Sequence, residues 1–326
     1  MILVTGSVAT DHLMKFPGRF ADQLLPDHLD HVSLSFLVDD LVVQRGGVAG
    51  NICYGLGVLG QRPVLAAAVG TDFREYEVWL SGHGVETGGA WVSYQAHTAR
   101  FTCTTDDDLA QLASFYPGAM SEASRISLAE LVERFGRPEL VVVGANDPAA
   151  MIKHTNEARA LGIPFAADPS QQLARLDAAQ IRDLLDGASY LLTNEYEWGL
   201  LQSKAGVTAE QVIENSTIRV TTLGAQGVEI TDRQGAVLHV PAVAANATVD
   251  PTGVGDGFRA GFLHAQANGA SLARSAQLGS AVAVLVLEAS GPQGWRWDRE
   301  AAVKRIADAY GRTAADEIEA LWADGR

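Results

Sequence analysis

Residues 139–168 read ELVVVGANDPAAMIKHTNEARALGIPFAAD, and this stretch decides the fold. The apolar run from Leu140 to Val143 is followed by helical spacing from Pro148 to Leu161 and by a second apolar run from Phe165 to Ala167. Short apolar runs joined by a helical segment are typical of parallel strands that are covered on both faces. The stretch therefore predicts a β-α-β unit.

The alternation of strands and helices continues beyond this unit. Further buried strands are expected at Ile2 to Gly6, Tyr190 to Leu192 and Ile218 to Thr222. Further helices are expected at Ala178 to Leu185, Glu195 to Leu201, Gly253 to Ala267, Ala270 to Glu288 and Arg299 to Tyr310. Repeated units of this kind predict an α/β protein with a doubly wound, mostly parallel sheet flanked by helices. We expect residues 1–326 to form a single domain.

Two segments break this alternation, and both read as antiparallel strands. They are Val32 to Gln44 and Ala90 to Thr105. We expect them to form a small β-sheet lid, made of residues 11–45 and 88–118, over one end of the main sheet. The first segment is rich in aliphatic and aromatic residues, which predicts that one face of the lid meets a second subunit in a homodimer.

The composition is that of a globular protein with an acidic surplus. Lys and Arg number 24 and Asp and Glu 39, a net charge of −15, so a nucleic-acid partner is not expected. The longest apolar run, Ala281 to Leu287, is far shorter than the roughly 18 residues that span a bilayer, and no membrane partner is expected. The first residues do not resemble a secretory signal, and Cys53 and Cys103 lack metal-ligand spacing. We expect a cytoplasmic protein.

A glycine-rich turn that enters a helix carries the strongest chemical signal. Residues 250–262 read DPTGVGDGFRAGF. Gly253 and Gly255 allow a ligand to approach the backbone, and the free amides of a helix N-terminus attract anions such as phosphate. Asp256 falls in the first turn, where it could accept a proton from a hydroxyl group that attacks phosphorus. The alternative is an ordinary helix start at which Asp256 only interacts with the helix dipole.

This motif resembles the second signature, D-T-x-G-A-G-D, of the ribokinase-like (PfkB) kinases, and four other motifs agree with it. They are Thr5 to Asp11, which resembles an opening strand that ends in a sugar-binding Asp; Gly46 to Asn51, which resembles the first signature; Asn194 to Glu197, which matches N-x-x-E; and Thr222 to Gly227, which matches T-x-G-x-x-G. The chain departs from the family pattern at Pro251, Val254 and Gly257.

Within this family, the chain is most similar to the actinobacterial, mycobacterial-type adenosine kinases. The resemblance rests on Ser7 to Met14, Val32 to Leu41, His97 to Thr105, Ser114 to Glu122 and Asp168 to Arg175. It implies an enzyme of purine salvage that transfers the γ-phosphoryl group of ATP to the 5′-hydroxyl of adenosine, giving AMP and ADP. In that reaction Asp256 would be the general base, and the amides of Gly253, Val254, Gly255 and Asp256 would form an anion hole.

The resemblance also assigns the ligand contacts. Adenosine would be bound by Ser7, Asp11, Ser35, Phe36, Gly47, Asn51, Phe101, Phe115, Gln171, Gln172 and Arg175, with the adenine ring stacked between Phe101 and Phe115. ATP would be bound by Asn194, Thr222, Gly224, Gly227 and Gly255. Glu197 and Asn194 would hold Mg²⁺ through water, and Asp250 and Thr252 would hold a monovalent cation such as K⁺.

Three alternative functions share parts of this sequence pattern. A kinase for ribose, fructose, guanosine or inosine would share the fold and the phosphate machinery. A nucleoside-binding protein without catalysis would need neither Asp256 nor the glycine-rich turn. Gly55 to Gly60 matches G-x-G-x-x-G, but these glycines end the helical stretch that starts at Val48, whereas a dinucleotide fingerprint opens a helix, so nicotinamide binding is not expected.

Overall fold

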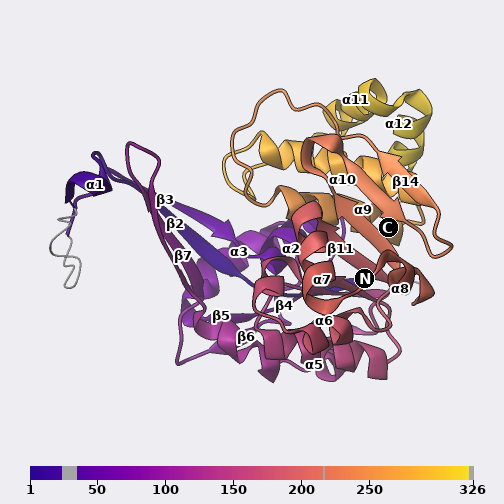
Figure 1. Ribbon diagram of the computed structural model, residues 1–326, viewed down its shortest axis with the longest axis horizontal. Helices are drawn as coiled ribbons and strands as arrows, with labels where there is room; N and C mark the ends of the chain where they lie inside the picture. Colours follow the sequence, from indigo (N-terminus) through magenta and orange to yellow (C-terminus); the bar gives the residue numbers. More distant parts are fainter. Residues whose placement is uncertain (24–34, 216, 323–326) are drawn as a thin grey trace.

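A computed structural model of the chain (Figure 1) describes residues 1–23, 35–215 and 217–322. Its centre is an eight-stranded sheet in the order β14-β13-β12-β11-β10-β9-β1-β4. The strands are β1 (Ile2–Thr5), β4 (Val64–Ala66), β9 (Leu140–Gly144), β10 (Phe165–Asp168), β11 (Tyr190–Asn194), β12 (Ile218–Thr222), β13 (Val228–Thr231) and β14 (Val237–Val240). The strands from β4 to β12 are parallel, and only β13 and β14 pair antiparallel.

Helices cover both faces of this sheet. They are α2 (Val48–Val58), α3 (Arg74–Gly82), α4 (Leu128–Phe135), α5 (Pro148–Ala160), α6 (Ala178–Leu185), α7 (Glu195–Ala205), α8 (Ala209–Glu214), α9 (Val254–Ala267), α10 (Leu272–Leu287), α11 (Arg299–Tyr310) and α12 (Arg312–Glu319), besides the short α1 (Phe20–Gln23). Short 3₁₀ turns occupy Thr71–Phe73, Gly118–Arg125, Ser170–Ala174, Gly224–Gln226 and Ala320–Trp322. None of the helices in the described ranges has the length and apolar character that a membrane span requires.

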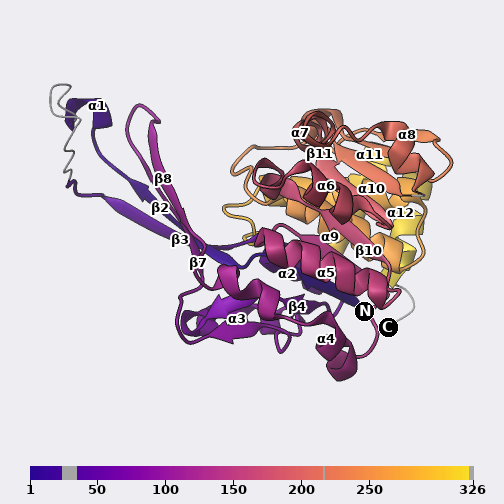
Figure 2. The same cartoon turned by 60° about the horizontal axis from the view of Figure 1, so that its bottom comes forward.

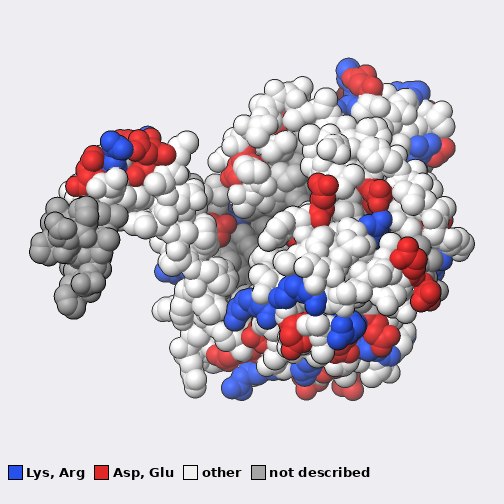
Figure 3. Space-filling view, viewed as in Figure 1, with Lys and Arg blue, Asp and Glu red and all other residues white. Residues whose placement is uncertain are grey.

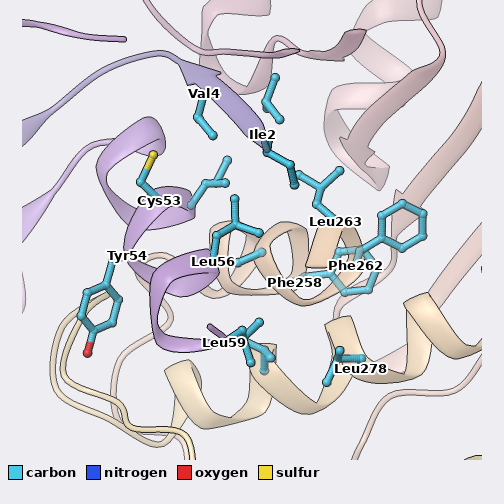
Figure 4. Packing of buried hydrophobic residues seen from close by; sticks show 14 of the residues in the cluster. Ile2, Val4, Cys53, Tyr54, Leu56, Leu59, Phe258, Phe262, Leu263 and Leu278 are labelled. Atoms are coloured by element: carbon cyan, nitrogen blue, oxygen red, sulfur yellow. The ribbon is translucent and has the colours of Figure 1, made fainter. Parts of the chain in front are cut away.

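Each face of the sheet has its own core. Ile2 and Val4 of β1 point into a cluster with α2, α9, α10, α11 and α12, whereas Leu3 points into a cluster with α4 to α8. This follows from the alternation of side chains along a strand. Figure 4 shows the first cluster, in which Leu56 of α2 lies near Phe258 of α9. The close packing of α2 and α9 places the starts of both helices on the same side of the molecule.

The predicted fold class is confirmed, because the sheet is doubly wound, mostly parallel and flanked by helices. Every predicted strand from residue 139 onward is present, and α6 and α11 have the predicted bounds. The helix predicted at Glu195 to Leu201 continues to Ala205. Gly55 and Gly57 lie inside α2, and Gly60 follows its end with φ of +93°, which agrees with their assignment to a helix end rather than to a dinucleotide site.

A second, small sheet extends from the body as an arm (Figures 1 and 2). We call this four-stranded β3-β2-β7-β8 sheet the small sheet; it contains β2 (Ala9–Lys15), β3 (Asp40–Gly46), β7 (Ala99–Thr105) and β8 (Gln111–Tyr116). The antiparallel assignment was wrong in part, because β2 and β7 pair parallel. A third pair, β5 (Ala68–Gly70) and β6 (Trp91–Ser93), is also parallel.

The strand predicted at Val32 to Gln44 starts later than expected. Residues 35–39 are not in a strand, β3 begins at Asp40, and residues 32–34 lie outside the described residues. The aromatic ring of Phe36 packs instead against Phe16 and Phe20, with ring centroids 4.9 and 5.4 Å apart. Phe36 therefore belongs to an aromatic cluster, whereas the apolar residues after Asp40 belong to β3. The alternation of apolar residues does not distinguish the two, so it placed the start of the strand too early.

Candidate active site

A cavity of about 720 Å³ lies at the carboxyl ends of the parallel strands. Ser7 after β1, Ala145 after β9, Ser170 after β10, Asn194 at the end of β11 and Thr222 at the end of β12 all line it. In open α/β sheets this edge is where ligands bind, because the strand ends and helix starts meet there. Figure 3 shows the hollow between the small sheet and the body, with acidic atoms inside it.

The start of α9 forms one wall of the cavity. Gly253 precedes the helix with φ of +77°, and a Cβ atom there would lie 2.4 Å from the Cβ atom of Pro292, so only glycine fits. Among the described residues no side chain caps this helix start. Val254 N donates to Pro251 O at 3.4 Å and Gly257 N donates to Gly253 O at 2.9 Å, and the amides of Gly255 and Asp256 lie between these two bonds. These amides can bind an anion.

The start of α2 approaches the same wall. Gly47 has φ of +88°, and a Cβ atom there would lie 2.6 Å from the carbonyl oxygen of Ser7. The Ser7 hydroxyl accepts a hydrogen bond from Val48 N at 3.1 Å, which fixes the loop after β1 to the helix. One turn on, Asn51 Nδ2 donates to Asp256 Oδ2 at 2.8 Å. The two predicted signatures, distant in sequence, therefore meet at Asp256.

The carboxyl group of Asp256 has an unusual electrostatic environment. Burial raises its pKa to about 7, although Arg259 and the hydrogen bond from Asn51 act in the opposite direction. Arg259 is 6% exposed and lies one turn further along α9, with Nε 2.6 Å from Asp168 Oδ2 and Nη2 3.8 Å from Glu197 Oε2. Asp256 can thus exchange a proton near neutral pH beside a fixed positive charge.

Sequence reasoning missed Arg259 and Asp168, which both form part of this site. Arg259 lines the cavity, and Asp168 is fully buried at the end of β10. The spacing of three residues between Asp256 and Arg259 places both on one helix face, and this spacing was the signal that could have identified the arginine. Asp168 follows the predicted strand Phe165 to Ala167 and pairs with Arg259, but the resemblance gave it no role.

The small sheet forms the opposite wall. Asp11 of β2, Phe101 of β7 and Phe115 of β8 line the cavity, and they are consecutive partners across the sheet. Burial, and the charge of nearby Asp250, raise the pKa of Asp11 to about 6. Phe101 and Phe115 are direct cross-strand neighbours on one face, so a base cannot stack between them as predicted. A ring would have to lie across both.

The polar residues predicted for the base side also line the cavity. Gln171, Gln172 and Arg175 lie in or next to the turn that follows β10. Gln172 is 6% exposed, and its Oε1 atom is buried without a hydrogen-bond partner in the described part of the chain. Ser170, which starts this turn, has φ of +47°, a strained conformation for a residue with a side chain, and such strain is common at functional sites.

Asn194 and Glu197 line the cavity and cap α7 at the same time. Glu197 N donates to Asn194 Oδ1 at 2.7 Å, and Asn194 N donates to Glu197 Oε2 at 2.8 Å, which is a capping box. Asn194 Nδ2 and Glu197 Oε1 are not used by this box. The remaining groups are thus an amide donor suited to phosphate and a carboxylate oxygen suited to a hydrated cation.

Five predicted site residues lie outside the cavity lining. They are Ser35, Phe36, Val254, Gly227 and Asp250, whereas Gly224, Gly253, Gly255 and Thr252 do line it. Gly227 closes the turn after β12, and a Cβ atom there would lie 2.1 Å from Val240 O, so it is a packing residue. Asp250 accepts hydrogen bonds from Thr252 N at 2.8 Å and Gly291 N at 3.1 Å, which tie two loops together.

Comparison with known proteins adds to this geometry. Residues 6–298 match the pfkB carbohydrate kinase family. A nucleoside kinase from Methanothermobacter thermautotrophicus is 31% identical over 271 residues, which cover 82% of this chain and 86% of that protein. The family match contains the motifs at residues 46–51, 194–197, 222–227 and 250–262.

Solved structures show the same relationship. A nucleoside kinase from Burkholderia thailandensis in complex with inosine has a TM-score of 0.83 and 31% identity, and the match covers 95% of this chain and 99% of that one. An adenosine kinase from Sinorhizobium meliloti has a TM-score of 0.69 and 20% identity, over 90% of this chain and 95% of that one. The second similarity concerns the fold alone, so these comparisons do not separate adenosine kinases from other nucleoside kinases.

Proposed function

Because the chain belongs to the pfkB family of carbohydrate kinases, we propose that it transfers the γ-phosphoryl group of ATP to the 5′-hydroxyl of a nucleoside, preferably adenosine. The observation that carries this proposal is the position of Asp256. It lies at the free amides of α9 and lines one cavity with Asp11 and Phe101 of the small sheet. A hydroxyl group held by the small sheet would meet both a base and an anion hole.

The acceptor side of the cavity suits a ribose that carries a base. Asp11 accepts hydrogen bonds from the 2′ and 3′ hydroxyls, which a diol requires and which its ionised form accepts most strongly. The neighbouring rings of Phe101 and Phe115 provide an apolar surface for the base. Binding a free sugar would leave these rings uncovered, so the proposal favours a nucleoside over ribose or fructose.

The adenosine preference rests on the base side of the cavity and on the resemblance of the variable segments to adenosine kinases. Gln172 Oε1 is a buried acceptor without a partner among the described residues, and the 6-amino group of adenine is a donor. Inosine presents an acceptor oxygen at that position. The inosine complex of the Burkholderia protein makes inosine the strongest competing substrate.

Phosphoryl transfer needs alignment and positive potential more than covalent chemistry. The amides of Gly255 and Asp256 face the transferred group, and Asn194 Nδ2 with the turn at Thr222 and Gly224 binds the rest of ATP. Asp256 accepts the proton of the 5′-hydroxyl as attack proceeds. Its pKa of about 7 means that a large fraction is ionised at neutral pH.

Two cations fit the residues of this site. Glu197 Oε1 can hold Mg²⁺ through water, because Mg²⁺ keeps several of its waters. Mg²⁺ bound with ATP neutralises charge on the phosphates. K⁺ would bind at the loop that Asp250 ties together, behind the anion hole. Each carboxylate oxygen of Asp250 accepts one hydrogen bond and keeps a lone pair that can bind the cation. The rate with K⁺ replaced by an organic cation checks that assignment.

The small sheet acts as the lid of this site and as the contact surface of a homodimer. Leu41 and Val43 are each 55% exposed, and Leu112 is 49% exposed. Strand alternation places these three on the face opposite Asp11, Phe101 and Phe115. A second copy covers this apolar face, because an exposed apolar sheet is otherwise a site of aggregation.

A substrate panel tests the proposed function. ADP release from ATP is measured with adenosine, inosine, guanosine, ribose and fructose at equal concentrations. The expected order is adenosine first, then the other purine nucleosides, with little activity on free sugars. The greatest kcat/KM on a free sugar would contradict the nucleoside assignment, and a preference for inosine would contradict only the role of Gln172.

A further inference from the structure

A line of side-chain hydrogen bonds leads from Trp79 through Gln293 and Asn51 to Asp256. Trp79 Nε1 donates to Gln293 Oε1 at 3.0 Å, and Gln293 Nε2 donates to Asn51 Oδ1 at 2.9 Å. Asn51 Nδ2 then donates to Asp256 Oδ2 at 2.8 Å. Gln293 is 6% exposed and does not line the cavity, so it has no direct access to substrate.

The chemistry of these groups fixes the direction of every bond. An indole N–H can only donate, so Gln293 must present its carbonyl oxygen to Trp79. Its amide nitrogen then faces Asn51, which must present Oδ1 in return. The remaining amide nitrogen of Asn51 is therefore directed at Asp256. Without Gln293, the Asn51 amide could turn over and present an oxygen to the carboxylate.

Gln293 is also linked to the base of the small sheet through Tyr76 of α3. Its Nε2 atom donates to the Tyr76 hydroxyl, which in turn donates to Gly46 O at 3.0 Å. Gly46 is the last residue of β3. Both hydrogens of the Gln293 amide and its oxygen are thus used, which holds the side chain in one orientation.

We propose that Gln293 is a positioning residue: it holds the Asn51 amide so that Nδ2 donates to one oxygen of Asp256 and leaves the other oxygen for the substrate hydroxyl. The effect of this role on catalysis rests on the proposed function, whereas the hydrogen bonds themselves do not depend on it. Loss of Gln293 weakens the donor to Asp256 and so favours the protonated carboxyl group.

Other charges near Asp256 must be held constant in a test. Arg259 of the same helix, Asp168 at the end of β10 and Glu197 of α7 all influence its pKa, and Asp11 of the small sheet lines the same cavity. Variants that add or remove charge would therefore confuse the result. Gln293→Met and Trp79→Phe are both neutral and keep most of the side-chain volume.

The experiment follows the carboxyl carbon of Asp256 by NMR titration in the full-length protein without ligand, with the signal assigned through Asp256→Asn. In Gln293→Met we expect the titration midpoint to rise by about one pH unit, as loss of a hydrogen bond to a charged group implies. Trp79→Phe removes only the donor that orients Gln293, and we expect a smaller shift in the same direction. The acid limb of kcat should move with the midpoint.

The matched control is Gln266→Met, which also removes side-chain bonds of a glutamine but far along α9. Gln266 Nε2 donates to Ala270 O and to Ser275 Oγ, at 3.1 and 2.7 Å. This variant should lose thermal stability without moving the Asp256 midpoint. An unchanged midpoint in every folded Gln293 and Trp79 variant overturns the proposal. Absence of kinase activity in the wild type, with the shift present, would instead overturn the proposed function alone.

Discussion

At the scale of single residues, two of the carboxyl groups that line the cavity have pKa values raised by burial. The value is about 6 for Asp11 and about 7 for Asp256. In the proposed reaction both groups act in the ionised form, one as acceptor for the ribose and one as base, so protonation of either should lower activity. The pH dependence of kcat/KM reports groups of the free enzyme.

The first prediction concerns this pH dependence. We expect log(kcat/KM) for adenosine to fall with a slope of about one below pH 7 and a slope of about two below pH 6, because two protons then inactivate the site. In Asp11→Asn the slope should stay near one over the whole acid range. A wild-type profile that is flat between pH 5 and 8 would contradict both assignments.

The second prediction concerns the binding role of Asp11. Asp11→Ala removes a charged acceptor, whose hydrogen bonds are worth about 1.5–3 kcal/mol, so KM for the nucleoside should rise about 10- to 100-fold. KM for ATP should change little. Asp40→Ala, an exposed position at the start of β3, is the control in the same sheet. An Asp11→Ala enzyme with the wild-type nucleoside KM would show that the ribose lies elsewhere.

At the scale of elements, the start of α9 depends on a left-handed glycine in a crowded position. Gly253 and Gly269, at the two ends of this helix, have nearly equal φ angles of +77° and +78°. A Cβ atom at Gly253 would lie 2.4 Å from Pro292 Cβ, whereas at Gly269 nothing lies within 4 Å. Comparison of the two alanine variants therefore separates backbone strain from crowding.

The third prediction is that Gly269→Ala costs about 1–2 kcal/mol of unfolding free energy, through backbone strain alone, and leaves kcat unchanged. Gly253→Ala should cost a further 1–3 kcal/mol or so from the clash, and it should also lower kcat because the amides of the anion hole shift. Denaturant unfolding and steady-state kinetics measure both. Equal losses of unfolding free energy in the two variants would mean that the clash with Pro292 is avoided at no cost and that crowding at Gly253 does not matter.

The sequence predicted the strand ends that line the cavity but not the packing of the aromatic residues. Asn194 and Thr222 were assigned through their resemblance to family motifs, and both stand at the ends of buried parallel strands, whose polar ends meet at one edge of the sheet. The place of Phe36 was missed, because its partners Phe16 and Phe20 lie in the short segment from the end of β2 to the start of α1, which has no periodicity. The position of Phe101 directly beside Phe115 also depends on the register of β7 and β8, and the pattern of a single strand does not determine register.

The place of Gln293 could not be predicted from the sequence either. It lies in the loop after α10, in no motif, and its partners Asn51 and Trp79 are more than two hundred residues away in the chain. Asn51 lies on α2 and Trp79 on α3, and the packing of that loop against these two helices brings the three side chains together. By contrast, Arg259 follows Asp256 by one turn, so its presence in the site was open to prediction from helix spacing.

At the scale of the whole molecule, the acidic chain binds an anionic substrate through local features. The net charge is −15, yet the cavity is lined by the buried Arg259 and by the start of α9, whose free amides attract anions. The small sheet supplies the opposite wall, so the site consists of one side from the body and one from the arm (Figure 2). The apolar outer face of that arm should be covered in a homodimer.

The fourth prediction tests this dimer. Val43→Glu places a charge in the proposed contact on β3, and sedimentation at micromolar concentration should show conversion of dimer to monomer. Val237→Glu is the matched control, because Val237 is also an exposed valine on an edge strand, in β14. That variant should remain a dimer. A monomeric wild type would remove the basis for the proposed contact.

The most direct measurement of the central claim is the rate of adenosine-dependent ADP formation by the wild type and by Asp256→Asn, with AMP identified as the product. We predict turnover by the wild type and a loss of about 10²–10⁴ in kcat for the variant, with adenosine binding nearly intact, because a general base acts in the transition state. Full turnover by Asp256→Asn, or ADP formation that does not depend on a nucleoside, would contradict the account.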